Sequence, residues 1–261
     1  MLAQQRQAII LDRARRVGAV RVSDLVDALD VSDMTVRRDL DVLAGKGLVE
    51  KVYGGATAVT PRSTDEPGFE QKSVRQQTQK EAIAAAAAEL VEPGSAIGLT
   101  AGTTTWTFAH ALAEIPGLTV VTNSVQVADI LRGVTESDRN VVLTGGVRTP
   151  SDALVGPVAV HSLRALNLDM VFLGIHGMAM ESGFTTPNLT EGETNRAFVS
   201  AGRRLAVLAD HTKWDSVGIS TIAELADADV LVSDDGLPDP AARTLQDQVG
   251  QLVMATTRED E

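Results

Sequence analysis

Cysteine is absent from this sequence of 261 residues, and aromatic residues make up only 3% of it. The absence of cysteine excludes disulfide bonds, thiolate metal ligands and cysteine nucleophiles. Because aromatic rings are scarce, the core must be built mainly from Ala, Val, Leu and Ile. No apolar run reaches the roughly 18–20 residues that a membrane-spanning helix needs. We therefore expect a cytoplasmic protein with no membrane partner.

Acidic residues outnumber basic ones, but not evenly along the chain. The net charge is −12 overall, while residues 1–55 hold nine Lys and Arg against eight Asp and Glu, a net of +1. Residues 56–261 hold fourteen against twenty-seven, a net of −13. This balance excludes a protein that coats nucleic acid along its whole length. It indicates a small, nearly neutral module followed by a large acidic one.

The first 56 residues carry apolar residues at helical spacing in three short stretches, followed by a strand. The second and third stretches are separated only by a turn at Asp30 and Val31, and Ser23 and Ser32 are the predicted N-caps. Residues 48–53 are then predicted to form a short strand, which ends at two glycines. Three helices and a hairpin in this order predict a winged helix-turn-helix over residues 1–56.

The third of these stretches has two distinct faces. Val36, Leu40 and Leu43 form its apolar stripe, which we expect to pack inward. The opposite face and the N-terminal end hold Ser32, Met34, Thr35, Arg37, Arg38 and Asp41. Arginine can pair with guanine or clamp a phosphate, so this helix is the predicted DNA-reading element. The alternative is that Arg37 and Arg38 are solvated residues on a protein-interaction adaptor.

The run VSDMTVRRDL at residues 31–40 resembles the recognition-helix signature of the DeoR-type bacterial transcriptional regulators. The residues Tyr53, Gly54, Gly55 and Ala56 are similar to the wing of that family, in which a histidine often stands where this chain has Tyr53. The resemblance implies DNA binding, with Tyr53 and Gly54 at the tip of the wing.

Residues 57–69 have no periodicity and contain Pro61 and Pro67, so we expect a linker between two domains. The next stretch, 70–91, is rich in alanine and is predicted to be one helix. Residues 70–261 as a whole are the predicted effector-sensing and oligomerisation domain.

Eight short apolar runs follow the alanine-rich stretch, with helical segments between several of them. The predicted strands are Ala96–Thr100, Leu118–Thr122, Val141–Thr144, Met170–Gly174, Leu205–Ala209, Ile219–Ile222, Val230–Val232 and Gln251–Ala255. Most are fully apolar, as strands covered on both faces are. The pattern predicts a Rossmann-like α/β domain with a largely parallel sheet. The chain has no Walker motif, no G-x-G-x-x-G after the first strand and no histidine spacing typical of a metal site, so we expect no cofactor.

The strand exits share small and polar residues. The candidates are Ala101, Gly102, Thr103, Thr104, Asn123, Gly145, Gly146, His176, Asp210 and Lys213. Ligands of open α/β sheets bind outside the carboxyl ends of the strands. A helix that begins at Thr103 directly after Gly102 would suit a phosphate. The alternatives are that these clusters are ordinary turns and N-caps, that Lys213 is a surface residue and that His176 has no role.

The large module also resembles a family, because its motifs are similar to those of the DeoR-type sensor domain. Besides the strand exits, the motifs include residues 183–186, which end in Thr186, and Glu191. That domain is similar in fold to ribose-5-phosphate isomerase, and the resemblance implies a phosphorylated sugar or related metabolite as effector. The loop 174–178 has no carboxylate where the isomerases carry aspartates, which argues against an enzyme.

Taken together, we expect a transcriptional regulator that represses an operon for sugar or carbohydrate metabolism and is released by a phosphorylated metabolite. Its expected partners are operator DNA, this effector and further copies of the chain in an even-numbered homo-oligomer. The alternatives are a sugar-phosphate isomerase with an N-terminal adaptor, and an adaptor that uses the winged helix to bind proteins.

Overall fold

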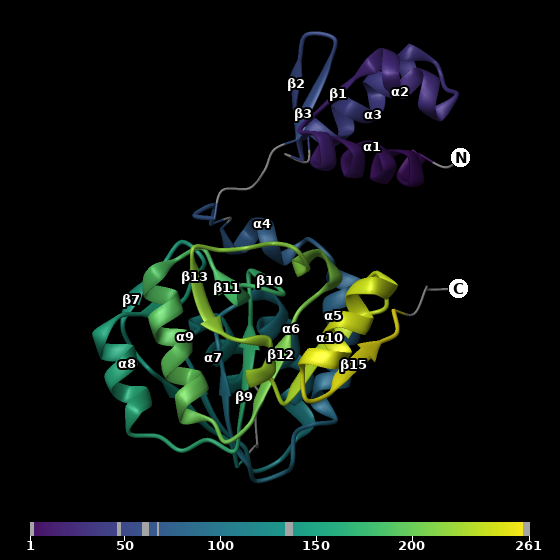
Figure 1. The fold of residues 1–261 in the computed structure, drawn as a ribbon. Helices are drawn as coiled ribbons and strands as arrows, with labels where there is room; N and C mark the ends of the chain where they lie inside the picture. Colours follow the sequence, from purple (N-terminus) through teal and green to yellow (C-terminus); the bar gives the residue numbers. More distant parts are fainter. Residues whose placement is uncertain (1–2, 46–47, 59–62, 67, 134–137, 258–261) are drawn as a thin grey trace. The chain divides into compact units, whose positions relative to one another are not determined.

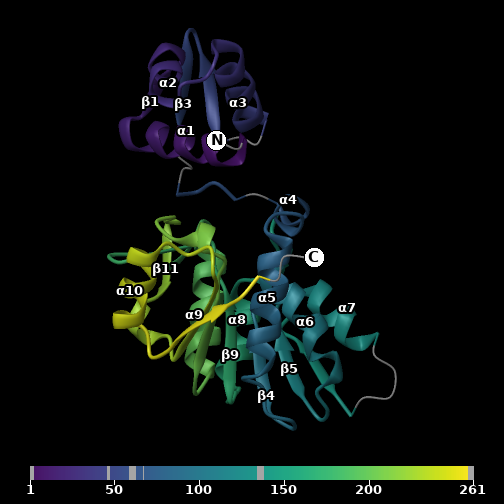
Figure 2. The ribbon, with the colours of Figure 1, turned by 90° about the vertical axis from the view of Figure 1, so that its right-hand side faces the viewer.

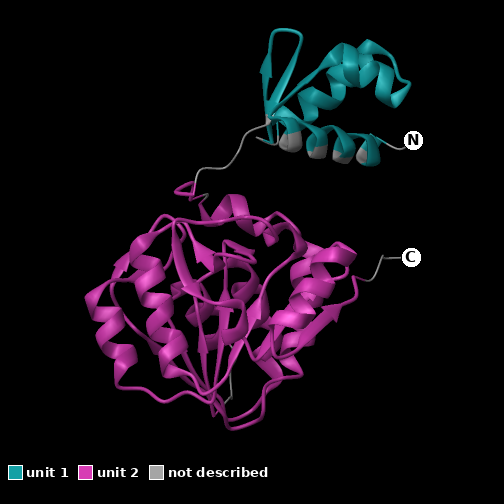
Figure 3. Ribbon diagram, viewed as in Figure 1, with its two compact units in different colours: residues 1–62 teal, residues 63–261 magenta. Residues whose placement is uncertain are grey.

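The protein is described from a computed structural model, in which the chain forms two compact units. They comprise residues 1–62 and 63–261 (Figure 3). The described residues are 3–45, 48–58, 63–66, 68–133 and 138–257. The division falls inside the segment 57–69 that the sequence marks as a linker; Pro61 and Pro67 lie outside the described residues. No helix in the described ranges is long and apolar enough to cross a membrane.

The first unit is a winged helix-turn-helix. Its elements are α1 (Ala3–Val17), β1 (Ala19–Arg21), α2 (Val22–Leu29), α3 (Asp33–Gly45), β2 (Val49–Val52) and β3 (Gly55–Ala58) (Figure 1). The strands pair antiparallel in the order β1-β3-β2. The sequence does not predict β1, and β3 extends past residue 56. Ser32 caps α3, since the amide of Thr35 donates to its Oγ at 3.2 Å. The prediction for Ser23 is wrong: α2 already begins at Val22, and the Ser23 hydroxyl bonds Asp24 instead.

A buried ion pair joins α1 to α3 beside the apolar core of the first unit. Val36, Leu40 and Leu43 are fully buried, as the periodicity predicts. Between them, Asp39 is only 3% exposed and accepts a hydrogen bond from Arg6 Nε at 2.5 Å. Gln7 Nε2 donates to the same carboxylate at 3.0 Å. Asp39 therefore positions the third helix rather than facing outward with its arginine neighbours.

The second unit is built on seven parallel strands in the order β15-β14-β12-β9-β4-β5-β6. In chain order these are β4 (Ala96–Leu99), β5 (Thr119–Thr122), β6 (Asn140–Leu143), β9 (Met170–Gly174), β12 (Leu205–Leu208), β14 (Val230–Asp234) and β15 (Leu252–Ala255). The prediction of a largely parallel α/β sheet is confirmed. The carboxyl ends of all seven strands lie at one edge of the sheet because the strands are parallel.

Helices cover both faces of this sheet (Figure 2). One face packs against α5 (Gln77–Ala88), α6 (Thr103–Ala111) and α7 (Val125–Arg132), and the other against α8 (Pro157–Arg164), α9 (Leu189–Ala201) and α10 (Asp239–Gln248). Successive residues of a strand point to opposite faces. Phe172 thus joins the first core, while Val171 and Leu173 join the second. Three 3-10 turns span Leu112–Glu114, His211–Lys213 and Leu225–Asp227.

Smaller sheets flank the main one. The antiparallel sheet β10-β11-β13 is formed by β10 (Gly177–Ala179), β11 (Gly183–Thr186) and β13 (Ser220–Ala223), and β7 (Val147–Arg148) pairs with β8 (Leu154–Val155). All eight predicted strands are present, but the run 219–222 belongs to this small sheet and not to the parallel one.

The predicted single helix over residues 70–91 is two helices, α4 (Phe69–Ser73) and α5. Gln76 between them has a left-handed backbone, with φ 52°. The ammonium of Lys80, whose residue is 3% exposed, donates to the carbonyl oxygens of Lys72 and Arg75 at 2.5 Å each. The Lys72 carbonyl also accepts from the amide of Arg75 at 3.3 Å. The lysine thus bonds carbonyl oxygens at and just beyond the C-terminal end of α4, where a helix leaves acceptors unpaired.

Replacing Gly55 with alanine should destabilise the first unit. A Cβ at this position would lie 2.0 Å from the carbonyl oxygen of Val20, so β3 must move away from β1. We expect a loss of about 1–3 kcal/mol, as for other overpacked sites. Hydrogen exchange of α3 peptides in the full chain measures this loss of stability. Gly45→Ala is the matched control, because nothing lies within 4 Å of its Cβ; equal exchange in the two variants would contradict the prediction.

Candidate functional sites

The exposed face of α3 carries the predicted DNA-reading residues. Met34 is 75% exposed, and Arg37 and Arg38 are exposed beside it. Arg37 is not an isolated charge: its Nε lies 2.5 Å from Asp33 Oδ1, one helical turn away. This hydrogen bond raises the pKa of Arg37 above its ordinary value. Asp33 bonds Nε and Nη2 of Arg37, so a nucleic-acid phosphate or base that binds these two groups together must replace Asp33.

The remaining predicted DNA-contacting residues lie at the N-terminal end of α3 and in the wing. The hydroxyls of Ser32 and Thr35 bond each other at 2.8 Å. Tyr53 is fully exposed at the tip of the wing, and Gly54 beside it has φ +80°, which favours glycine. Lys51 on β2 forms an ion pair with Asp41 of α3. The wing is thus tied to the helix, with its tyrosine ring unburied.

In the second unit, the sheet order brings five of the predicted strand exits to one edge. The strands β12, β9, β4, β5 and β6 are consecutive neighbours, and all are parallel. The amide of Ala101 donates to Asn123 Oδ1 at 2.7 Å, which joins the exits of β4 and β5. The amide of Gly174 donates to Thr100 Oγ1 at 2.9 Å, which joins β9 to β4. The convergence expected from the sequence is present in the fold.

The start of α6 is open at this edge. Gly102 precedes it with an extended backbone, and no side chain caps the helix. Thr103 and Thr104 are 8% and 7% exposed. A Cβ at Gly102 would meet only Thr105 Oγ1 at 3.2 Å and the Gly174 Cα at 3.9 Å. The first amides of α6 therefore offer an anion helix-end donors that no described side chain caps.

Two of the candidates brace the loops in which they lie. Asn123 is 1% exposed, and besides accepting from Ala101 it donates from Nδ2 to the Leu154 carbonyl at 3.1 Å. Asp210, also 1% exposed, accepts from the amide and the hydroxyl of Thr212. These bonds give both side chains a positioning role that the sequence does not reveal.

The two glycines after β6 differ in their surroundings. Gly146 has φ +124°, and its Cβ would lie 2.5 Å from the carbonyl oxygen of Val155. It is needed for the close approach of β7 to β8. Gly145 has φ +72°, and its Cβ would meet Val158 Cγ1 at 3.4 Å. Gly146 is therefore accounted for by packing, whereas Gly145 lies at the strand exit itself.

Glu191, in the first turn of α9, is surrounded by hydroxyl groups. Its Oε1 accepts from Thr149 at 2.8 Å and from Ser151, and its Oε2 accepts from Thr186 at 3.2 Å. Asn188 caps the same helix, because its Oδ1 accepts from the amide of Glu191 at 3.1 Å. Thr186 and Glu191 thus belong to one hydrogen-bonded group.

A group of three basic residues, Lys72, His176 and Lys213, lies close together, and Lys72 lies close enough to Glu191 for their charges to interact. Burial lowers the pKa of Lys72, and the nearby charge of Lys213 lowers it further, while Glu191 opposes both effects. Burial and the charges of Lys213 and Lys72 lower the pKa of His176 to about 4. His176 is therefore neutral at pH 7, and the two ammonium groups supply the positive charge.

Sequence reasoning missed Lys72 and Lys80, because a lysine in an alanine-rich helix is typical of a solvated surface. Burial lowers the pKa of Lys80 to about 8, although the charge of Asp210 opposes this shift. The only signal was that Lys72 and Lys80 bracket the polar run 73–79, which has no apolar period. The break between α4 and α5 falls in this polar run.

A further polar pair, His211 and Asp234, lies at the carboxyl edge of the parallel sheet. His211 Nδ1 lies 2.6 Å from Asp234 Oδ2, and the His211 amide donates to Asp234 Oδ1 at 2.7 Å. The side-chain hydrogen bond raises the pKa of His211. Among the described residues, no group of three His, Asp or Glu side chains is placed to hold a metal ion.

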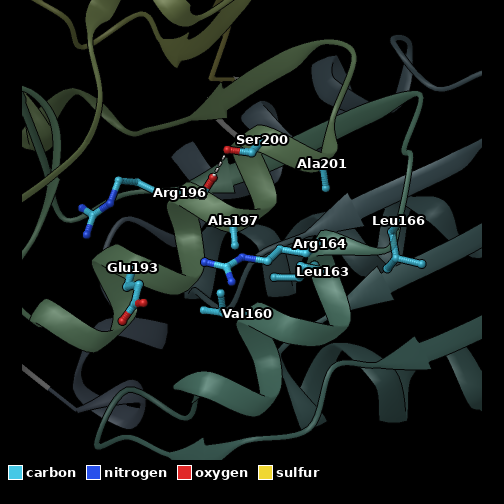
Figure 4. Close-up of a pocket in the computed structure, with 9 residues that line it drawn as sticks. All are labelled: Val160, Leu163, Arg164, Leu166, Glu193, Arg196, Ala197, Ser200 and Ala201. Carbon is cyan, nitrogen blue, oxygen red and sulfur yellow. Dashed lines mark hydrogen bonds between the residues drawn. The ribbon is translucent and has the colours of Figure 1, made fainter.

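The surface also has a hollow of about 330 Å³ between α8 and α9 (Figure 4). Its lining includes Leu163, Arg164, Glu193 and Arg196. None of the predicted effector residues lines it, so the hollow is separate from the strand exits.

Comparison with known proteins gives two family matches that together span most of the chain. The model described as "DeoR-like helix-turn-helix domain" matches residues 6–62. The model described as "DeoR C terminal sensor domain" matches residues 75–235.

Similar full-length proteins are named as transcriptional regulators. The uncharacterized regulator YgbI of Escherichia coli K12 is 37% identical, over 98% of this chain and 99% of its own. A putative aga operon transcriptional repressor of Escherichia coli O157:H7 is 32% identical over 90% and 87%. The glycerol-3-phosphate regulon repressor of Haemophilus influenzae is 29% identical over 94% of each. These names favour the regulator over the isomerase and adaptor alternatives.

Similarity to solved structures is lower. Ribose 5-phosphate isomerase A from Neisseria gonorrhoeae is 20% identical, with a TM-score of 0.37 over 52% of this chain and 53% of its own. At this low similarity, neither a ligand nor a reaction can be transferred from the isomerase to this chain.

The low pKa of His176 predicts a specific pH dependence of stability. In the unfolded chain this residue takes up a proton near pH 6.5, but in the folded chain only near pH 4. Below pH 6.5 the unfolded state therefore binds more protons, and the stability of the second unit falls toward pH 4. Between pH 7 and pH 5 we expect His176 to account for a loss on the order of 1–2 kcal/mol.

Urea unfolding at the two pH values measures this loss. His176→Gln should abolish that part of the pH dependence. His161→Gln, which alters an exposed histidine of α8, is the control and should leave it unchanged. The same pH dependence in wild type and His176→Gln would show that the residue is not held neutral.

Proposed function

This chain belongs to the DeoR family of helix-turn-helix transcriptional regulators, and we propose that it is a cytoplasmic repressor of a sugar or carbohydrate operon, released from its operator by a phosphorylated metabolite. The observation that carries the effector proposal is the open start of α6 at an edge where Lys72 and Lys213 also gather. The names of two relatives, an aga operon repressor and a glycerol-3-phosphate regulon repressor, support this class of regulated genes.

The phosphate of the effector would bind at the start of α6. There it gains the amides and hydroxyls of Thr103 and Thr104, the helix dipole and the close approach that Gly102 allows. Lys213 adds a point charge from the exit of β12, two strands away from β4. Glu191 and the hydroxyls around it are then suited to bond the polar groups of the sugar.

Regulation requires that the effector bind two states of the protein with different affinity. The states differ in whether the winged helix units can engage an operator. One such unit offers a small interface, so useful affinity comes from reading two half-sites together. We therefore also propose an even-numbered homo-oligomer held mainly by residues 70–261.

Replacing Arg37 and Arg38 together with alanine should abolish operator binding while the fold is retained. Both side chains are exposed and neither belongs to the buried stripe of α3. Each lost contact should cost about 1–3 kcal/mol of binding free energy. A mobility-shift assay with the DNA upstream of the protein's own gene measures the effect. The control replaces Arg132 and Arg243, exposed arginines of the second unit, and unchanged operator affinity in the first variant would refute the assignment.

Gly102→Asp should leave operator binding intact and remove the response to the inducer. The new carboxylate would stand where the phosphate is proposed to bind, while its Cβ would make a tight contact of 3.2 Å with Thr105 Oγ1. Lys213→Ala should weaken the response in the same direction. Operator release is titrated with D-ribose 5-phosphate and related sugar phosphates, and Gly102→Ala, which adds the Cβ without the charge, is the matched control. If both variants release DNA at the wild-type inducer concentration, the phosphate site lies elsewhere.

Light scattering of the purified chain should give an even multiple of the 27.5 kDa mass at micromolar concentration. A fragment of residues 63–261 should keep the same assembly, because the contacts are proposed to lie in that unit. A monomer that nevertheless binds its operator tightly would contradict the proposed assembly.

A further inference from the structure

Two residues at the start of the second unit, Ser63 and Glu66, bond residues far along the chain in the same unit. The carbonyl oxygen of Ser63 accepts a hydrogen bond from the amide of Ile219 at 2.8 Å. Glu66 Oε2 accepts from Asn188 Nδ2 at 3.0 Å. Both partners border the small sheet β10-β11-β13, and α4 begins three residues after Glu66 at the same end of the unit (Figure 1).

The carboxylate of Glu66 lies in the neighbourhood of the proposed effector site. Its partner Asn188 caps α9, and the amide that this cap holds is that of Glu191. The charge of Glu66 acts on Lys72 and on His176, two of the three basic residues described above. Its second oxygen, Oε1, is buried, and no described residue donates a hydrogen bond to it. A buried carboxylate oxygen without a donor is costly, which lowers the stability of the docked arrangement.

We propose that Glu66 is a built-in competitor of the anionic effector: its carboxylate holds residues 63–66 on the second unit beside Lys72 and Asn188, and an incoming phosphate displaces it. This rests on the proposed effector site. The phosphate takes the positive charge of Lys72, repels Glu66 and frees the segment from Asn188 and Ile219. Since the chain continues from Ser63 through residues 59–62 to the wing, the binding event is passed to the DNA-binding unit.

Asn188→Asp provides a second way to release the segment. Aspartate is as good an N-cap as asparagine, so α9 keeps its start. It replaces the donor to Glu66 by a carboxylate, which repels it. Glu66→Gln removes the charge with little change of shape, and Glu70→Gln removes a charge from an exposed position of α4 as the matched control.

Two measurements on the full chain test the proposal. Isothermal titration with D-ribose 5-phosphate and with inorganic phosphate gives the affinity, and hydrogen exchange of peptides that contain Ile219 reports the docking of Ser63. We expect Glu66→Gln to bind both anions about five- to tenfold more tightly than wild type and Glu70→Gln. Exchange at Ile219 should rise on adding either anion to wild type, and be raised without anion in Glu66→Gln and Asn188→Asp.

Each outcome decides between the proposals. If wild type binds the anions but Glu66→Gln binds them no more tightly, or Ile219 exchange does not change, Glu66 is a structural contact only and the effector site stands. If neither wild type nor Glu66→Gln binds either anion, the effector site itself is wrong, and the role of Glu66 falls with it.

Discussion

The buried ammonium of Lys80 is the interaction on which the proposed effector site depends. It donates to the carbonyl oxygens of Lys72, in the last turn of α4, and of Arg75, which follows that helix. Together with the left-handed backbone of Gln76, this contact holds a break in a stretch whose composition alone favours one helix. On the α4 side of the break, Lys72 lies close enough to Glu191 and Lys213 for their charges to act on it. The charge that the proposed phosphate needs is thus placed by the break.

The fold could be predicted from the sequence wherever the residues to be buried recur with the clear spacing of a helix or a strand. The stripe of Val36, Leu40 and Leu43 and the apolar runs of the parallel strands have one arrangement that buries them, so their elements were predictable. Single long-range bonds leave no such pattern. β1 exists because its backbone pairs with β3, and α4 ends because of Lys80, 7 residues beyond Ser73. Neither cause is visible in local composition.

The candidate site was predictable to the extent that topology dictates it. Parallel strands place their exits together, so the residues after β4, β9 and β12 share an edge whatever their side chains do. What each side chain does there depends on partners distant in sequence. Asn123 bonds Leu154, and Glu191 bonds Thr149 and Ser151, about forty residues away. The sequence identifies these residues but not their partners.

The DNA-reading role proposed for Arg37 gives its ion pair with Asp33 a consequence for how the protein finds its operator. A free guanidinium offers all its N–H groups to a phosphate, whereas Nε and Nη2 of Arg37 bond Asp33, and DNA that takes these two groups exchanges places with the carboxylate. That exchange is nearly neutral on unrelated DNA, where only phosphates are offered, and favourable where a guanine edge accepts both of its N–H groups. Asp33 therefore subtracts from binding to the many incorrect sites on a chromosome more than from binding to the correct one.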